Sequence, residues 1–195
     1  DGSAWISLVP MKMSDLHFKH LPPLPGLDHF LEMNLRTYVR VDDEPGVHFF
    51  SIDCNDLLSD WYASHFLKLP CLRAAMTLEL TDGAYVYESH RTAHKDPPGD
   101  LIARYAPVGA AFETQPGSLE HFLVERYAMF FPSGKGSVLR GEMKHNPWQV
   151  QRADVDLMIN TIPRAAGFEV GNRPDAALYA QGVDTYAWPV TKESE

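Results

Sequence analysis

The stretch from Val47 to Leu80 constrains the fold more than any other part of the chain. It opens with VHFFSID, which reads as a strand, and residues 57–69 then place apolar side chains at three- and four-residue spacings. This spacing is typical of one face of a helix. Pro70 ends the helix, because the residue before a proline is disfavoured in the helical region. Residues 73–80 alternate, so the stretch predicts a strand, a helix and a second strand.

The rest of the chain predicts short strands joined by turns. Residues 32–41 alternate between two faces, and the DDEPG turn leads back into the strand that starts at Val47. Residues 81–83 (Thr-Asp-Gly) are a tight-turn signal between strands at 73–80 and 84–90. Further strands are expected at residues 4–10, 101–105, 127–131, 137–144 and 147–157, and near residues 178 and 186.

Two further short helices are expected. The first follows Ser118, a typical N-cap residue, in the segment SLEHFLVERY. The second covers residues 160–166 and is closed by Gly167. The elements together predict a mainly β fold with a few helices (α+β), built as an antiparallel barrel or sandwich with appended helices.

Composition narrows the class of protein. A length of 195 residues fits one domain that spans residues 1–195. The net charge of −9 argues against nucleic-acid binding, and no apolar run is long enough to cross a membrane. The sequence shows no signal peptide, and its two cysteines, Cys54 and Cys71, form at most one disulfide, so we expect a cytoplasmic protein. The chain starts at Asp1 rather than Met, and we expect a segment to be missing before it.

Several motifs, in the same order along almost the whole chain, resemble those of the YqjF-like family of uncharacterised bacterial proteins. They are DGSAWISLVP, LPPLPGL, NLRTYVR, PGVHFFSIDCND, PGSLEHFLVERY and RGEMKHNPW. That family is grouped with acetoacetate decarboxylase in one fold superfamily. The resemblance implies a closed, cone-like antiparallel β barrel around an apolar pocket. Relatives usually carry a further segment before the DGSAW motif, which agrees with a missing N-terminal segment, and the resemblance also implies that the protein forms homo-oligomers.

The resemblance implies the fold but not the catalytic chemistry. Acetoacetate decarboxylase forms a Schiff base with a lysine in a Pro-Lys-Lys motif just after a helix, where burial and a neighbouring ammonium keep the amine neutral. The matching position is Pro70-Cys71-Leu72, which has no lysine. Decarboxylase activity is therefore not expected. Lys68 and Lys144 are the alternative lysines, although the end of a helix favours the charged form of Lys68.

Three side chains on one strand are candidates for ligand binding. Arg36, Tyr38 and Arg40 share a strand face. If this face points into a barrel, two guanidinium groups and a phenol would make a carboxylate-binding wall. The competing interpretation is a solvent-exposed face of an antiparallel sheet.

Three more residues complete the set of pocket candidates. Cys71 stands where the catalytic lysine would be, and Arg73, on the same strand face, could lower the pKa of its thiol, although a buried inert cysteine is the commoner case. Glu125 could act as an acid or base, although a structural ion pair is the commoner role. No metal site or cofactor is expected, because His17 with His20 and His90 with His94 lack a third ligand at a recognisable spacing.

These observations leave three functional hypotheses. The first is a protein that binds a small organic ligand, a carboxylate or an acyl compound, in the barrel without a Schiff-base lysine. The second is an enzyme with different chemistry on the same fold. The third is a non-catalytic scaffold for oligomerisation. Convergent groups with shifted pKa values would favour an enzyme, whereas an apolar pocket with one or two cations would favour ligand binding.

Overall fold

The computed structural model describes residues 2–14, 29–55, 71–93, 96–133, 137–188 and 190–192. The helix that the sequence predicts at residues 57–69 lies outside these residues, as do Lys68, His17, His20 and His94. The elements of the described residues are β1 (Ile6–Ser14), β2 (His29–Val41), β3 (Glu44–Cys54), β4 (Cys71–Thr81), β5 (Ala84–Arg91), β6 (Asp100–Glu113), α2 (Leu119–Val124), β7 (Ala128–Pro132), β8 (Val138–His145), β9 (Gln149–Asn160), α3 (Ile162–Ala165), β10 (Leu178–Tyr179), β11 (Thr185–Ala187) and β12 (Thr191–Lys192).

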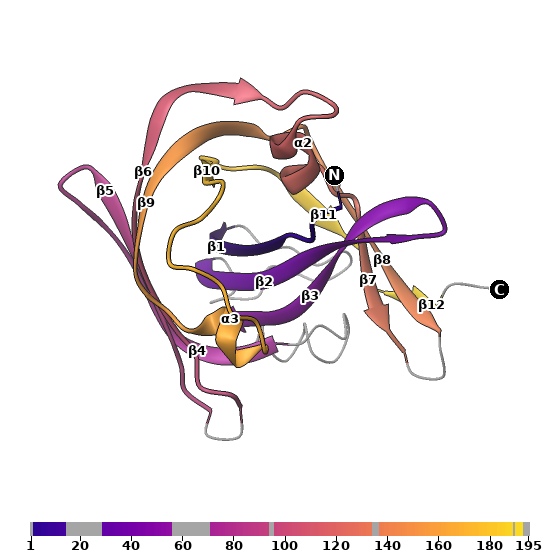
Figure 1. Ribbon diagram of the computed structural model, residues 1–195, viewed down its shortest axis with the longest axis horizontal. Helices are drawn as coiled ribbons and strands as arrows, with labels where there is room; N and C mark the ends of the chain where they lie inside the picture. Colours follow the sequence, from indigo (N-terminus) through magenta and orange to yellow (C-terminus); the bar gives the residue numbers. More distant parts are fainter. Residues whose placement is uncertain are drawn as a thin grey trace.

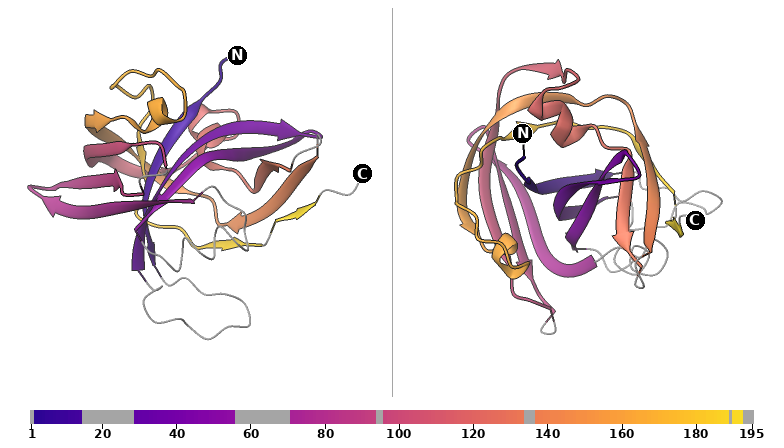
Figure 2. Two further views of the ribbon diagram at one scale, coloured as in Figure 1. Left: turned by 90° about the horizontal axis from the view of Figure 1, so that it is seen from below. Right: turned by 45° about the vertical axis from the view of Figure 1, so that its right-hand side comes forward.

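One sheet of twelve strands contains all of these strands. Its hydrogen-bonded path runs β10-β9-β6-β5-β4-β3-β7-β8-β11, while β2 and β1 extend from β3, and β12 pairs with β8. The strands curl into a ring, with β1, β2 and β3 crossing behind its centre (Figure 1), and the turned views in Figure 2 show the same curled arrangement. The mainly β fold is confirmed, and in the described residues no hydrogen-bonded pairing joins the two ends of the path.

Two strand pairs differ from the antiparallel expectation. β3 pairs with β4 in parallel at residues 52–54, and with β7 in parallel at Val47. Both neighbours lie on the edge of β3 that β2 does not occupy, so the sheet divides there into two arms. Sequence periodicity gives the faces of each strand but says nothing about strand direction, which explains why these pairs were not predicted.

The local turn and cap predictions are confirmed. Asp82 (φ 52°) and Gly83 (φ 74°) both adopt the left-handed conformation that a two-residue hairpin turn needs between β4 and β5. The Ser118 side chain accepts a hydrogen bond of 3.1 Å from the His121 N–H, so it caps α2. Gly167 has φ 88° just after α3, which is the usual conformation at the end of a helix.

The two faces of β2 pack against different cores. The larger core joins β2, β4, β5, β6 and α3, and its buried residues are Met33, Leu35, Ala74, Met76, Tyr87, Leu101, Ala103 and Ile162. The smaller core joins β3 and β7, and its buried residues are Val47, Phe49, Ile52, Met129 and Phe131. Leu35 belongs to the larger core, while Tyr38 packs against the smaller core. The face that carries Arg36 and Tyr38 is therefore turned away from the larger core.

Candidate anion-binding site

Arg36 and Tyr38 meet the C-terminal end of α2. The Arg36 Nη2 donates a hydrogen bond of 2.9 Å to the Leu123 carbonyl oxygen, and the Tyr38 hydroxyl donates one of 3.1 Å to the same atom. The last carbonyl groups of a helix lack hydrogen-bond partners within the helix. Arg36 and Tyr38 supply partners for one of them, although they lie 87 and 85 residues away from Leu123 in the sequence. A cation at this end of a helix also interacts favourably with the helix dipole.

Arg126 joins the same group, and the sequence analysis did not single it out. Its side chain follows α2 and is buried, with only 8% of the residue exposed. Its guanidinium carbon lies 4.5 Å from the centre of the Phe122 ring and 5.5 Å from that of the Tyr38 ring. The guanidinium carbon of Arg36 lies 5.7 Å from the centre of the same Tyr38 ring. Two guanidinium groups thus share one aromatic side chain.

The positive charges of Arg36 and Arg126 are not balanced by an ion pair. Among the described residues, no carboxylate oxygen lies within 4 Å of either guanidinium group. The Nε atoms of both arginines are buried and have no hydrogen-bond partner among the described residues. Burial lowers the pKa of Arg126 and the charges of Arg36 and Arg40 act in the same direction, while Tyr38 and Glu125 act against this shift. We call Arg36, Tyr38, Phe122 and Arg126 the arginine pair site.

Glu125 lies next to this site, and its carboxyl group accepts two hydrogen bonds from neighbouring donors. Its Oε2 accepts a hydrogen bond of 2.5 Å from the Tyr127 hydroxyl, and its Oε1 accepts one of 2.9 Å from the Trp148 N–H. The carboxyl group is directed at these two donors, while the Arg126 Nη1 binds the Glu125 carbonyl oxygen instead, at 2.7 Å. Burial and the Glu125 carboxylate raise the pKa of Tyr127 to about 12. The Trp148 Nε1 is a further buried donor without a partner in this region.

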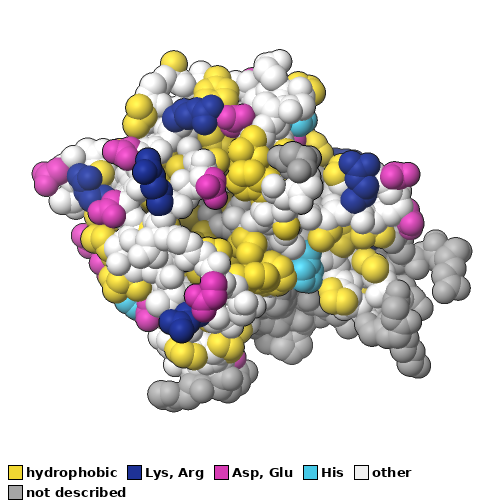
Figure 3. Space-filling model, viewed as in Figure 1, with side chains coloured by type: hydrophobic (Ala, Val, Ile, Leu, Met, Phe, Trp, Pro, Cys, Tyr) yellow, Lys and Arg dark blue, Asp and Glu magenta, His cyan; other side chains and the backbone are white. Residues whose placement is uncertain are grey.

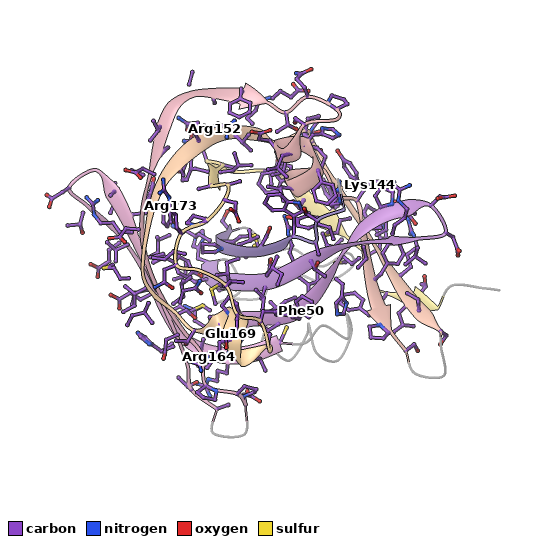
Figure 4. All side chains as sticks on the ribbon, viewed as in Figure 1. Phe50, Lys144, Arg152, Arg164, Glu169 and Arg173 are labelled. Carbon is purple, nitrogen blue, oxygen red and sulfur yellow. The ribbon has the colours of Figure 1, made fainter. Side chains whose placement is uncertain are left out.

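The other predicted pocket residues are not part of the arginine pair site. The Arg40 side chain is 67% exposed and lies 3.7 Å from the Asp43 carboxylate. Cys71 packs against the smaller core, and Arg73 is exposed on the same side of β4. Lys144, labelled in Figure 4, lies 3.1 Å from the Glu142 carboxylate and 5.2 Å from the centre of the Trp188 ring.

A second polar site connects β3 with β5 inside the larger core, and the sequence analysis missed it. Arg91 binds Asp53 through two hydrogen bonds of 2.8 and 3.0 Å, and the side chains are 3% and 0% exposed. The Arg91 Nη2 also donates a hydrogen bond of 2.8 Å to the Ser51 hydroxyl. Burial raises the pKa of Asp53, and the charge and hydrogen bonds of Arg91 act against this rise. Asp53 and Leu72 are register partners on β3 and β4, so this ion pair lies next to the start of β4.

His90 is the one described member of the histidine pairs that the sequence analysis considered. Its Nδ1 lies 2.8 Å from an oxygen of Asp100, on the outer side of β5 and β6. In the described part of the chain, no group of three His, Cys, Asp or Glu residues is arranged to hold a metal ion. No described helix has the length and apolar character that crossing a membrane would need.

Comparisons with known proteins place the chain in a family. Residues 1–184 match the model of the family DUF2071, described as an uncharacterized conserved protein. The chain is 34% identical over 194 residues to uncharacterized protein YqjF of Bacillus subtilis (strain 168). This match covers 100% of the chain and 79% of the YqjF sequence. The fold resembles the crystal structure of acetoacetate decarboxylase from Legionella pneumophila, with a TM-score of 0.52 and 12% identity over 96% of this chain and 69% of that one. The fold is therefore acetoacetate-decarboxylase-like, and the chain belongs to the DUF2071 family.

Proposed function

We propose that this protein binds a small organic anion, a carboxylate or an acyl compound that carries one, between Arg36 and Arg126. One observation carries the proposal: two guanidinium groups flank Tyr38, and no carboxylate of the described residues lies within 4 Å of either. Most buried charges in proteins are paired, because an unpaired charge loses its hydration without compensation. A bound carboxylate would supply the missing negative charge.

The chemistry of the site fits this ligand class. A guanidinium group matches the geometry of a carboxylate, which accepts two parallel hydrogen bonds from it. The Nε–H groups of both arginines, which have no partner among the described residues, are donors, and an anion offers acceptors only. The protein as a whole carries a net charge of −9, so the local excess of positive charge runs against its overall charge. The rings of Tyr38 and Phe122 lie 4.8 Å apart and provide an apolar wall for the rest of the ligand.

The proposal does not include Schiff-base chemistry. Cys71 occupies the position that matches the lysine motif of acetoacetate decarboxylase, and a thiol cannot form an imine with a ketone. We also propose that the curled sheet closes into the barrel that the resemblance implies. Arg40, Cys71, Arg73 and Glu125 would then shape or support the pocket rather than contact the anion.

Titration calorimetry with pyruvate and acetoacetate at constant ionic strength tests the proposal. Wild-type protein and Arg104→Met, which removes an exposed arginine of β6, should release or absorb heat with a saturable profile. Arg126→Met should not. Equal binding by all three proteins would overturn the assignment to Arg126, and absence of binding by the wild type would overturn the ligand class. Borohydride treatment followed by intact-mass measurement should give no adduct, and an adduct would restore a Schiff-base lysine.

A further inference from the structure

The segment between α3 and β10 crosses the open face of the ring in front of β1 and β2 (Figure 1). It begins at Gly167, whose φ of 88° suits a change of chain direction after a helix. Residues 169–173 are all exposed. The segment returns to the sheet at Ala177, whose carbonyl oxygen accepts a hydrogen bond of 3.1 Å from the Ala153 N–H. We call residues 167–179 the strap.

Aromatic rings attach both ends of the strap to the strands below. The Phe168 ring centre lies 4.8 Å from that of Phe50, which is labelled near the centre of the ring in Figure 4. The Tyr179 ring centre lies 5.7 Å from that of Tyr85 and 6.4 Å from that of Tyr105. Tyr85 and Tyr105 stack on one another at 5.4 Å across β5 and β6. The strap therefore covers aromatic rings that stand on the inner side of the sheet.

The Tyr179 hydroxyl also donates a hydrogen bond of 3.3 Å to the Tyr85 hydroxyl, and the remaining attachments of the strap are sparse. β10 pairs with β9 through only two residues, whereas β6 and β9 pair along most of their length. The Arg164–Glu169 pair, labelled in Figure 4, is 3.5 Å long and largely exposed, so water and salt weaken it. Segments with few buried contacts open at a lower free energy than the sheet on which they lie. Lifting the strap breaks the two-residue β10–β9 pairing, and the other strand pairs of the sheet stay in place.

We propose that the strap lifts to admit a flat, uncharged aromatic ligand, which stacks on Tyr85 and Tyr105. Figure 3 shows hydrophobic side chains exposed at the centre of the face that the strap crosses. Tyr85 and Tyr105 are nearly parallel, with 25° between their planes, and parallel rings present a surface for another flat ring. A lifted strap removes Tyr179 from these two rings, and the ligand replaces its contacts. This site does not involve Arg36 or Arg126.

A reversible lock tests the strap. Leu178 and Arg152 are direct partners in the β10–β9 register, so Leu178→Cys with Arg152→Cys places two thiols at a distance that a disulfide spans. The neutral fluorescent probe N-phenyl-1-naphthylamine should bind the reduced double variant and lose its binding on oxidation. Wild-type protein should bind the probe in both redox states, which controls for Cys54 and Cys71. Equal probe binding by the oxidised and reduced double variant would overturn the proposal.

Hydrogen exchange of the wild-type chain and of Phe168→Ala gives a second test. Amides of residues 168–177 should exchange about tenfold or more faster than those of β9, because the strap opens locally. Phe168→Ala should accelerate exchange in the strap further and leave the β9 amides unchanged. Exchange as slow in the strap as in β9 would overturn the proposal, as would equal acceleration of all strands by Phe168→Ala. Loss of pyruvate binding by Arg126→Met bears only on the anion site.

Discussion

The two arginine sites of this protein differ in how their charges are balanced. At the β3–β5 site, Arg91 is enclosed by Asp53 and Ser51, and its charge meets a carboxylate through two hydrogen bonds. At the arginine pair site, Arg126 is also buried but has an aromatic wall and a second arginine as neighbours. The charge of Arg91 is paired within the protein, whereas no carboxylate of the described residues lies within 4 Å of Arg126. We propose that the first site stabilises the fold and that the second binds the ligand.

The largest effect is expected from breaking the balanced site. Arg91→Met leaves the Asp53 carboxylate buried without a counter-ion, and loss of one partner of a buried pair typically costs about 3–5 kcal/mol. Urea unfolding should show this loss in the free energy of unfolding. Adding Asp53→Leu to Arg91→Met should recover much of it, because the unpaired charge is then gone. A double variant as unstable as the single one would show that packing rather than charge dominates.

The next-largest effect concerns Glu32, whose carboxyl group has a raised pKa. Burial raises the pKa of Glu32 from 4.5 to about 7, and a side-chain hydrogen bond with Asn34 acts against the rise. The folded protein therefore keeps a proton that the unfolded chain releases above pH 4.5. Stability should fall as the pH rises through the window from 4.5 to about 7. A shift of this size corresponds to a loss of about 3 kcal/mol.

Urea unfolding at several pH values measures the contribution of Glu32. The Glu32→Gln variant keeps a neutral hydrogen-bonding group at this position, so its stability should fall less over the same window. The difference between the two pH profiles isolates Glu32 from the histidines that titrate in the same range. Identical profiles would contradict the raised pKa of this carboxyl group.

Arg126→Met should have a smaller effect on stability than Arg91→Met. The substitution removes the hydrogen bond to the Glu125 carbonyl oxygen, worth about 1 kcal/mol, but it also removes a buried charge without a counter-ion. Because these two contributions oppose one another, we expect the free energy of unfolding to change by no more than about 1 kcal/mol in the absence of ligand. Urea unfolding with and without pyruvate measures both terms, and the stabilisation by pyruvate should disappear in the variant. A loss as large as that of Arg91→Met would contradict the contrast between the sites.

The smallest effect is expected at Arg40, the third arginine that the sequence analysis grouped with Arg36. Its exposed pair with Asp43 should contribute no more than about 0.5 kcal/mol. Arg40→Ala should therefore unfold at nearly the same urea concentration as the wild type and bind pyruvate with unchanged affinity. Weakened binding would extend the arginine pair site to the end of β2.

Local features of this fold were predictable because they depend on neighbouring residues. The hairpin turn at Asp82 and Gly83, the Ser118 cap and the Gly167 stop all follow from the conformational preferences of single residues. β6 was predicted to end at Tyr105 but continues to Glu113 through Pro107. Beyond Tyr105, β6 pairs only with β9, so Pro107 lies where no second neighbour needs its N–H.

The sites depend on contacts that the sequence does not contain. Arg91 and Asp53 are 38 residues apart, and Arg36 reaches the Leu123 carbonyl across 87 residues. The shared face of Arg36 and Tyr38 was readable from the alternation of β2, but the helix end that they contact was not. No sequence pattern identifies Arg126 as a site residue apart from its position directly after Glu125. Arg126 lies beside Tyr38 only because α2 packs on β2. Both sites arise where the sheet joins distant segments.

Nuclear magnetic resonance of the arginine Nε–H groups tests the contrast between the two sites most directly. The Arg36, Arg91 and Arg126 signals, assigned through single substitutions, are followed while pyruvate is added at constant ionic strength. We predict saturable shifts of the Arg36 and Arg126 signals, because these Nε–H groups have no partner among the described residues. The Arg91 signal should not shift, because its Nε–H already binds Asp53. Shifts of all three signals in parallel, or an unmoved Arg126 signal, would contradict this prediction.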